Sequence, residues 1–318
     1  MKKILISTLG LFACASAFAE ISDNGYGGKL ITGDYTASEL VQANGGSSEF
    51  GNFTLNGANI TITDATNIYA STPAAMTNNG TMTLRVVKGG KASSLSLASG
   101  STGSYKFAST ISSQSASLTI NIDENAGGYL YAERILTQSS PVTLNLGKDY
   151  AIRTSDENKT IAVAITDSWD MYINSSGDIS VELDIRNNAT MNLNLTNGAR
   201  FYLESLTRIQ KNNSTANIFI QNSLENGAIL FDKDIFVSGY EYDEELASYK
   251  IVVKKGANTE TILFSAIEGV DLSQLVWSDT LVDGYWALYG VSAVPEPAEW
   301  AMILGSLALG LAVYKRRK

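Results

Sequence analysis

Apolar and polar residues alternate with a period of two in many short segments of this chain. Val142-Thr143-Leu144-Asn145-Leu146 is the clearest example, because aliphatic side chains are separated there by one threonine and one asparagine. Side chains of a β-strand point alternately to its two faces, so this pattern predicts short strands with one buried and one wet face. We therefore predict an all-β fold, with strands over Leu118–Ile122, Val142–Leu146, Ile161–Ile165, Ile179–Ile185, Met191–Leu195 and Ile218–Ile220.

A weak internal repeat accompanies these strands. An Asn-Gly-Ala sequence precedes an apolar segment at Asn56–Ala58, Asn197–Ala199 and Asn226–Ala228, and a degenerate copy stands at Lys255–Ala257. The glycines of the last three copies are equally spaced. Asn-Gly favours positive φ angles, so each copy predicts a tight turn before a strand.

Two architectures fit this pattern. A parallel β-solenoid, or β-helix, would stack coils of roughly this length and bury the inward side chains of each coil on the next. A β-sandwich of hairpins is the alternative, because Asn-Gly is also a hairpin signal. We favour the solenoid for a β-rich passenger at residues 50–291, preceded by an irregular, glycine-rich N-terminal cap at residues 20–49. The aromatic segment Tyr285–Tyr289 is predicted to pack in the core of the closing strands.

The N-terminus has the three parts of a secretory signal peptide at residues 1–19. Lys2 and Lys3 precede the apolar segment Ile4–Phe12, and Ala17 and Ala19 supply the small residues that a signal peptidase requires. The apolar segment is short for a membrane span. We expect cleavage after Ala19; lipidation of Cys14 is the alternative.

The C-terminal end, residues 294–318, also has three parts. A proline-containing motif is followed by an apolar segment at residues 298–314 and by a basic end; the motif is Val294, Pro295, Glu296 and Pro297, and the basic residues are Lys315, Arg316, Arg317 and Lys318. Its uncharged residues, Trp300–Tyr314, would extend about 22 Å as a helix. The hydrocarbon core of a bilayer is about 30 Å thick, and it can thin to match a shorter helix. We therefore predict a transmembrane helix whose terminal cations stay in the cytoplasm and stop transfer.

This combination of motif, apolar segment and terminal cations, with a signal peptide at the other end, resembles the PEP-CTERM sorting signal of Gram-negative bacteria. In that family an exosortase recognises the Pro-Glu-Pro triplet, cleaves near it and passes the protein to the cell surface or matrix. The resemblance implies an exosortase partner, the inner membrane as a transit site and a final position at the surface or outside the cell. It covers only residues 294–318 and implies nothing about the passenger's activity. A plain membrane anchor that is never processed is the alternative.

Composition excludes several kinds of chemistry. The chain has no histidine, and its single cysteine, Cys14, lies in the predicted signal peptide. A mature chain without either residue has no Ser-His-Asp or Cys-His nucleophile and none of the usual zinc or copper ligands. A net charge of −9 argues against nucleic acid as a partner.

Two candidate clusters remain. Asp167 and Asp170 flank Trp169, and a sugar site can combine an aromatic platform with two acids. Asn121, Asp123 and Asn125 place oxygen ligands at alternate positions, as a calcium loop does, but the downstream glutamate of such a loop is absent. Ordinary solvent-facing loops explain both clusters, so we predict neither a metal, a cofactor nor a catalytic residue.

The sequence therefore predicts an exported structural or adhesive protein of the cell surface or extracellular matrix, with exopolysaccharide as a potential partner. The alternative is a secreted polysaccharide-active enzyme, a lyase or glycosidase, built on a β-helix.

Overall fold

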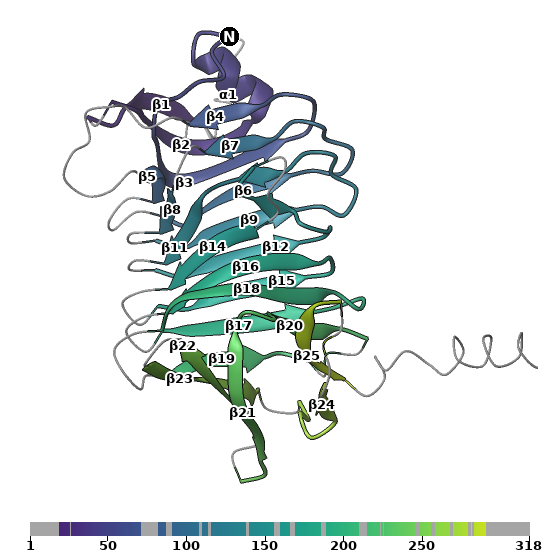
Figure 1. Ribbon diagram of the computed structural model, residues 1–318. Helices are drawn as coiled ribbons and strands as arrows, with labels where there is room; N and C mark the ends of the chain where they lie inside the picture. Colours follow the sequence, from purple (N-terminus) through teal and green to yellow (C-terminus); the bar gives the residue numbers. More distant parts are fainter. Residues whose placement is uncertain are drawn as a thin grey trace, which may run out of the picture.

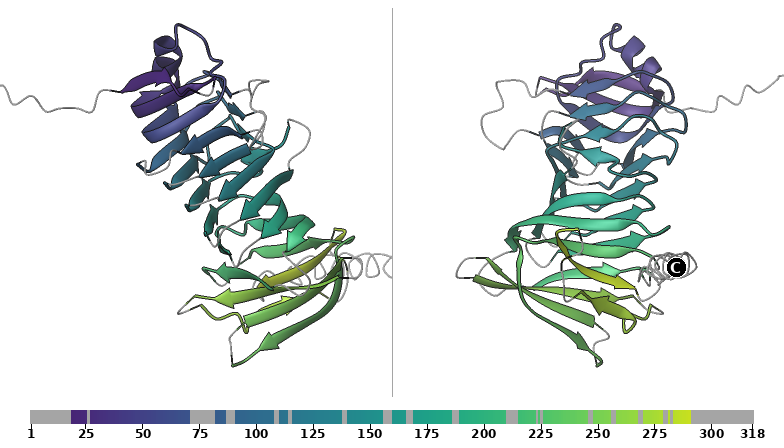
Figure 2. Two further views of the ribbon diagram at one scale, coloured as in Figure 1. Left: turned by 90° about the vertical axis from the view of Figure 1, so that its left-hand side faces the viewer. Right: turned by 45° about the vertical axis from the view of Figure 1, so that its right-hand side comes forward.

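The computed structural model describes residues 19–290 except 26, 71–81, 87–90, 108–109, 114–115, 138–139, 156–159, 166–168, 186–188, 210–214, 223, 225, 246–247, 256–257, 268–269, 279–280 and 282. It is 57% strand and 4% helix, and it forms a parallel β-solenoid of about six turns. Figure 1 shows the coils stacked between an N-terminal cap and a group of C-terminal strands, and Figure 2 shows the same stack from two other sides. The predicted solenoid is confirmed, whereas the sandwich alternative is wrong because stacked strands pair in parallel.

Two long parallel sheets form the main walls. Sheet 1 consists of β5 (Met82–Val86), β8 (Thr110–Ser113), β11 (Arg134–Thr137), β14 (Thr160–Ile165), β16 (Ile179–Ile185), β18 (Arg200–Ile209) and β20 (Ala228–Asp232). Sheet 2 consists of β6 (Ser93–Leu97), β9 (Leu118–Ile122), β12 (Val142–Leu146), β15 (Met171–Ser175), β17 (Thr190–Leu195), β19 (Thr215–Ile220) and β23 (Asn258–Ala266). The long β3 (Phe53–Ile62) joins both sheets, pairing with β5 through its first half and with β6 through its second. Gly57, with φ of +66°, lies between these halves.

A third, shorter sheet closes the early coils. Sheet 3 consists of β4 (Ile68–Ala70), β7 (Tyr105–Phe107), β10 (Leu130–Tyr131) and β13 (Ile152–Arg153), all parallel. After β13 the described residues show no further strand of sheet 3, and the chain passes between sheet 1 and sheet 2. Register partners in sheet 2 are 24 and 29 residues apart in the three-sided coils (Leu118 to Val142, Val142 to Met171) and 20 and 27 residues apart in the later coils (Met171 to Met191, Met191 to Ile218). Because coils of both kinds vary in length, the number of sides does not by itself set the uneven strand spacing in the sequence.

Both ends of the stack are capped. At the N-terminus, β1 (Glu20–Asp23) runs antiparallel to β2 (Lys29–Thr36), which pairs in parallel with β3. The helix α1 (Ala37–Ala43) follows, with Thr36 and Glu39 forming a capping box. The segment expected to be irregular thus contains a hairpin and a short helix. At the C-terminus, β21 (Phe236–Asp243), β22 (Ser248–Lys255) and β23 form an antiparallel meander, and β24 (Leu275–Trp277) pairs with β25 (Tyr285–Gly290).

The core is a set of aliphatic columns that run along the stack. Leu144 of β12 lies in register between Ile120 of β9 and Ile173 of β15, and all three side chains are buried. Burying one such side chain stabilises a fold by roughly 1.5–3 kcal/mol. Each coil therefore depends on its two neighbours for burial of its inward residues.

The structure corrects the interpretation of the Asn-Gly repeat. The copies at Gly198 and Gly227 do lie one coil apart, because Arg200 pairs with Ala228. The degenerate copy does not continue this column: its Gly256 lies outside the described residues, and the strand that follows, β23, belongs to sheet 2. Turn residues recur along this solenoid, but the coil length varies, so an equal spacing in sequence does not mark equivalent positions.

Candidate functional site

Most of the predicted sorting residues lie outside the described residues. This holds for Ala17, for Val294 to Pro297, for the apolar segment 298–314 and for Lys315 to Lys318, whereas Ala19 is described. No helix within the described ranges is long and apolar enough to cross a membrane. The sorting signal and its transmembrane helix therefore stay predictions.

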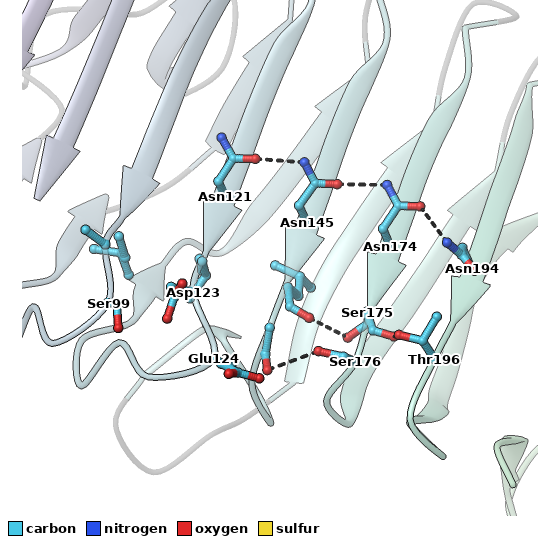
Figure 3. Close-up of a pocket in the computed structure, with 15 residues that line it drawn as sticks. Ser99, Asn121, Asp123, Glu124, Asn145, Asn174, Ser175, Ser176, Asn194 and Thr196 are labelled. Atoms are coloured by element: carbon cyan, nitrogen blue, oxygen red, sulfur yellow. Dashed lines mark hydrogen bonds between the residues drawn. The ribbon is translucent and has the colours of Figure 1, made fainter.

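The outer face of sheet 2 carries a continuous row of asparagine side chains, the asparagine ladder. It consists of Asn121, Asn145, Asn174 and Asn194, one from each of four successive strands (Figure 3). The amide nitrogen of Asn145 donates to Oδ1 of Asn121 at 2.7 Å, and Asn174 donates to Asn145 at 2.8 Å. Asn194 continues the ladder at 3.3 Å. Asparagine occupies this row because an outward position in a parallel stack meets its own equivalent in the next coil, and an amide both donates and accepts.

The asparagine ladder borders an open groove of about 580 Å³. The other polar residues that line the groove lie at or just after the ends of strands β6, β9, β15 and β17; they are Ser99, Asp123, Glu124, Ser175, Ser176 and Thr196. Ser175 Oγ donates to the Gly177 carbonyl at 2.6 Å, and Ser176 Oγ donates to that of Gly147 at 3.1 Å. Within the ladder the two inner amides, Asn145 and Asn174, each use one donor and one acceptor, which leaves a second N–H and a second lone pair. This groove can bind a hydroxyl-rich ligand at several equivalent positions.

Breaking the asparagine ladder is expected to weaken the stack measurably. Asn145→Ala removes two hydrogen bonds worth roughly 0.5–1.5 kcal/mol each, so the free energy of unfolding should fall by about 1–2 kcal/mol in a denaturant titration. Asn125→Ala is the matched control, because Asn125 is an exposed turn residue beside the groove and outside the ladder; it should change stability by less than about 0.5 kcal/mol. Equal losses in the two variants would contradict a stabilising role for the ladder.

The segment that resembles a calcium loop serves as a turn in this structure. Oδ1 of Asp123 accepts the backbone N–H of Asn125 at 2.9 Å, and the backbone N–H of Gly127 donates to Ser101 at 2.7 Å. The side chain of Asn121 is committed to the asparagine ladder and donates to Ser96 Oγ at 3.2 Å. In the described part of the chain no three histidine, cysteine or carboxylate residues gather as a metal site would require.

The acidic cluster around Trp169 is only partly described. Asp167 lies outside the described residues, so its distance from Asp170 is not defined. Asp170 accepts a hydrogen bond from the hydroxyl of Thr190 and another from Tyr172 at 3.4 Å, and Trp169 is 42% exposed. Neither Trp169 nor Asp170 lines the groove beside the asparagine ladder.

Sequence reasoning missed a second cavity, the tyrosine pocket, on the outer face of β18, β20 and β25. It has a volume of about 240 Å³, and the rings that line it are those of Tyr202, Tyr285 and Tyr289. The rings of Tyr202 and Tyr285 meet edge to face, with centroids 5.1 Å apart. The hydroxyl of Tyr285 donates to the carboxylate of Glu204 at 3.2 Å. Burial, reinforced by Glu204, raises the pKa of Tyr285 to about 12, so its hydroxyl stays a donor at neutral pH.

The tyrosine pocket corrects the expectation that Tyr285–Tyr289 is core. Strand β25 alternates, so Leu288 joins the main core and Trp286 packs against it, whereas Tyr285 and Tyr289 surround the pocket. The period-two pattern of β25 could have predicted that Tyr285 and Tyr289 lie on the opposite face from Trp286 and Leu288. It could not have identified Tyr202 as their neighbour, because that contact depends on β25 pairing antiparallel to β20.

Comparison with protein-family models, curated proteins and solved structures finds no match to this chain. Its function is therefore inferred from sequence motifs and from the geometry of these outward faces.

Proposed function

We propose that this protein is an exported structural or adhesive component of the cell surface or extracellular matrix. The observation that carries the proposal is the asparagine ladder, which repeats the same polar contact on successive coils of a rigid stack. Equivalent contacts held at fixed spacing bind a repetitive partner with an avidity well above that of one contact. The tyrosine pocket adds a second outward surface at the C-terminal end of the solenoid.

Delivery to that place follows from the two ends of the sequence. The signal peptide at residues 1–19 starts export through the inner membrane, and the apolar segment 298–314 holds the chain there. Pro295 and Pro297 keep the motif extended, since proline cannot continue a helix upstream of the membrane. An exosortase-type enzyme then binds Val294–Pro297, cleaves the chain near this motif and so releases the passenger from the membrane.

Removing the central glutamate of the motif is expected to block maturation. The Glu296→Ala variant, expressed in a Gram-negative host with an exosortase-type enzyme, should keep its C-terminal tail up to Lys318 and stay with the inner membrane. The unaltered chain should lose the tail near Val294 and reach the surface. Intact-mass spectrometry of membrane and extracellular fractions measures both, with Glu299→Ala as the matched control outside the triplet. Identical processing of Glu296→Ala and the unaltered chain would exclude the sorting signal.

The adhesive role is separately testable on the purified protein. We expect the protein to be retained on cell-surface material. After long incubation with a panel of glycans, we expect it to produce no new reducing ends. Cleavage of any glycan would replace this proposal with the polysaccharide-active enzyme.

A further inference from the structure

The outer face of sheet 3 carries aromatic and cationic side chains in strict alternation. Tyr69 of β4, Lys106 of β7, Tyr131 of β10 and Arg153 of β13 are in-register neighbours across four parallel strands. Their strand neighbours Ile68, Tyr105, Leu130 and Ile152 are buried, which places this row on the outward side. We call these four residues the cation–tyrosine row.

Close contacts between cations and rings hold the row together. Lys106 Nζ lies 5.6 Å from the ring centroid of Tyr69 and 5.5 Å from that of Tyr131. Beside the row, the ring of Tyr129 has Lys148 Nζ at 3.6 Å and the Arg153 guanidinium carbon at 3.5 Å. Such contacts stabilise a cation by roughly 0.5–2 kcal/mol. Lys148 Nζ also donates to the backbone carbonyls of Ala126 and Gly128 at 2.6 and 2.8 Å, and Arg153 Nε donates to that of Tyr150 at 3.0 Å. The ammonium of Lys106 and the Nη groups of Arg153 are left able to donate to a ligand.

The positive charge of this face is not neutralised by carboxylates in the described residues. Neither Lys106, Lys148 nor Arg153 forms an ion pair with a described aspartate or glutamate, although the whole chain has a net charge of −9. Burial, together with the nearby charge of Arg153, lowers the pKa of Lys148 to about 8. A bound anion would therefore relieve an existing electrostatic cost in this patch.

We propose that the cation–tyrosine row binds a linear acidic polysaccharide through the carboxylates of its uronate residues. Lys106 and Arg153 are two strands apart, or about 10 Å at the usual strand spacing, so they can bind carboxylates repeated along one polymer. Arg153 can hold a carboxylate with two parallel hydrogen bonds. The intervening ring of Tyr131 offers a flat apolar surface on which a sugar ring can lie, whereas the faces of Tyr129 are covered by Lys148 and Arg153. This inference rests on the proposed function, and it names the chemical class of the partner.

The same face suits nucleic acid less well. A phosphate backbone carries a dense charge that must be matched by several cations, whereas this row has two, Lys106 and Arg153, with Lys148 beside it. A polyuronate carries its charges on sugar rings, which the tyrosines can also contact.

The test is binding of the full mature chain, kept in a neutral detergent, to immobilised polygalacturonate. Dextran, which is neutral, and single-stranded oligothymidylate are the comparison surfaces. We expect binding to polygalacturonate that is at least about tenfold tighter than to the other two. It should weaken as the Debye length falls from about 30 Å in 0.01 M salt to about 3 Å in 1 M salt. This salt dependence needs no variant and is therefore independent of any folding defect.

Variants then locate the site. Lys106→Gln combined with Arg153→Gln should weaken binding to polygalacturonate about tenfold or more. Lys233→Gln combined with Lys250→Gln removes the same charge from an exposed turn after β20 and an exposed position of β22, and it should leave binding within about twofold of the unaltered protein. Thermal unfolding of each variant checks that the fold is kept; if the first pair unfolds, Lys106→Gln alone is used.

Three results would overturn the inference. They are an equal loss of affinity for polygalacturonate in the two double variants, binding that does not change with salt concentration, and tighter binding to oligothymidylate than to polygalacturonate. None of these bears on tail processing, which is measured by mass in cells, so failure of this inference and failure of the sorting proposal are distinguishable.

Discussion

Gly128→Ala is expected to lower the free energy of unfolding by about 3 kcal/mol, at the upper end of the cost of overpacking. A Cβ atom at Gly128 would lie far inside van der Waals contact distance of the carbonyl oxygen of Gly103, in the coil before. Gly103 stands in the same relation to the carbonyl of Thr66 one coil earlier. Because this contact is with backbone, no side-chain rotation relieves it, and the coils would have to separate beside the short strands of sheet 3.

Gly239→Ala is the matched control for this prediction. A Cβ atom at Gly239 has open space within 4 Å, and its φ angle is not in the left-handed region. The free energy of unfolding, measured by chemical denaturation, should change by less than about 0.5 kcal/mol in this variant. An equally small change in the free energy of unfolding for Gly128→Ala would contradict the close approach of neighbouring coils at this corner.

Leu144→Asp is expected to prevent folding altogether. Truncation of a buried leucine costs about 2–5 kcal/mol, and a carboxylate in the same place adds the cost of burying an unpaired charge. Together these approach the whole stability of a typical domain, about 5–15 kcal/mol. Leu144 is fully buried in the middle of its aliphatic column, so water cannot reach the new carboxylate without opening two coil interfaces.

The neighbouring position supplies the control. Thr143 is half-buried on the outer face of the same strand, so Thr143→Asp should fold and lose no more than about 1 kcal/mol. Far-ultraviolet circular dichroism reports whether each variant keeps its strands. Leu144→Ala, which should fold with a loss of about 2–5 kcal/mol, gives a measurable value if the aspartate variant cannot be purified. A folded, stable Leu144→Asp protein would refute the inward orientation of this residue.

These expectations follow from the way each coil depends on its neighbours. Inward residues are buried only when the adjacent coil covers them, and outward residues meet their equivalents only when the coils are in register. The same register that aligns Leu144 with Ile120 aligns Asn145 with Asn121. Stability and the repeated outer face are therefore produced by one geometric arrangement.

Much of this arrangement could be predicted from the sequence. Alternation identified strands at 118–122, 142–146, 179–185 and 191–195 to within a residue at each end, because a strand with one buried face must place apolar side chains at every second position. It also identified which residues face inward, since Leu144 and Leu193 are buried as their pattern requires. Fold class and core orientation are local consequences of that period.

The outward sites were decided only by the tertiary structure. Asn121 and Asn145, Tyr69 and Lys106, and Tyr202 and Tyr285 are brought together by strand pairing. Alternation is identical in parallel and antiparallel strands, so it cannot specify a partner strand, a register or a coil length. The physical reason is that a period of two records only which side of a strand meets the core, whereas the identity of the neighbour depends on where the chain turns and returns.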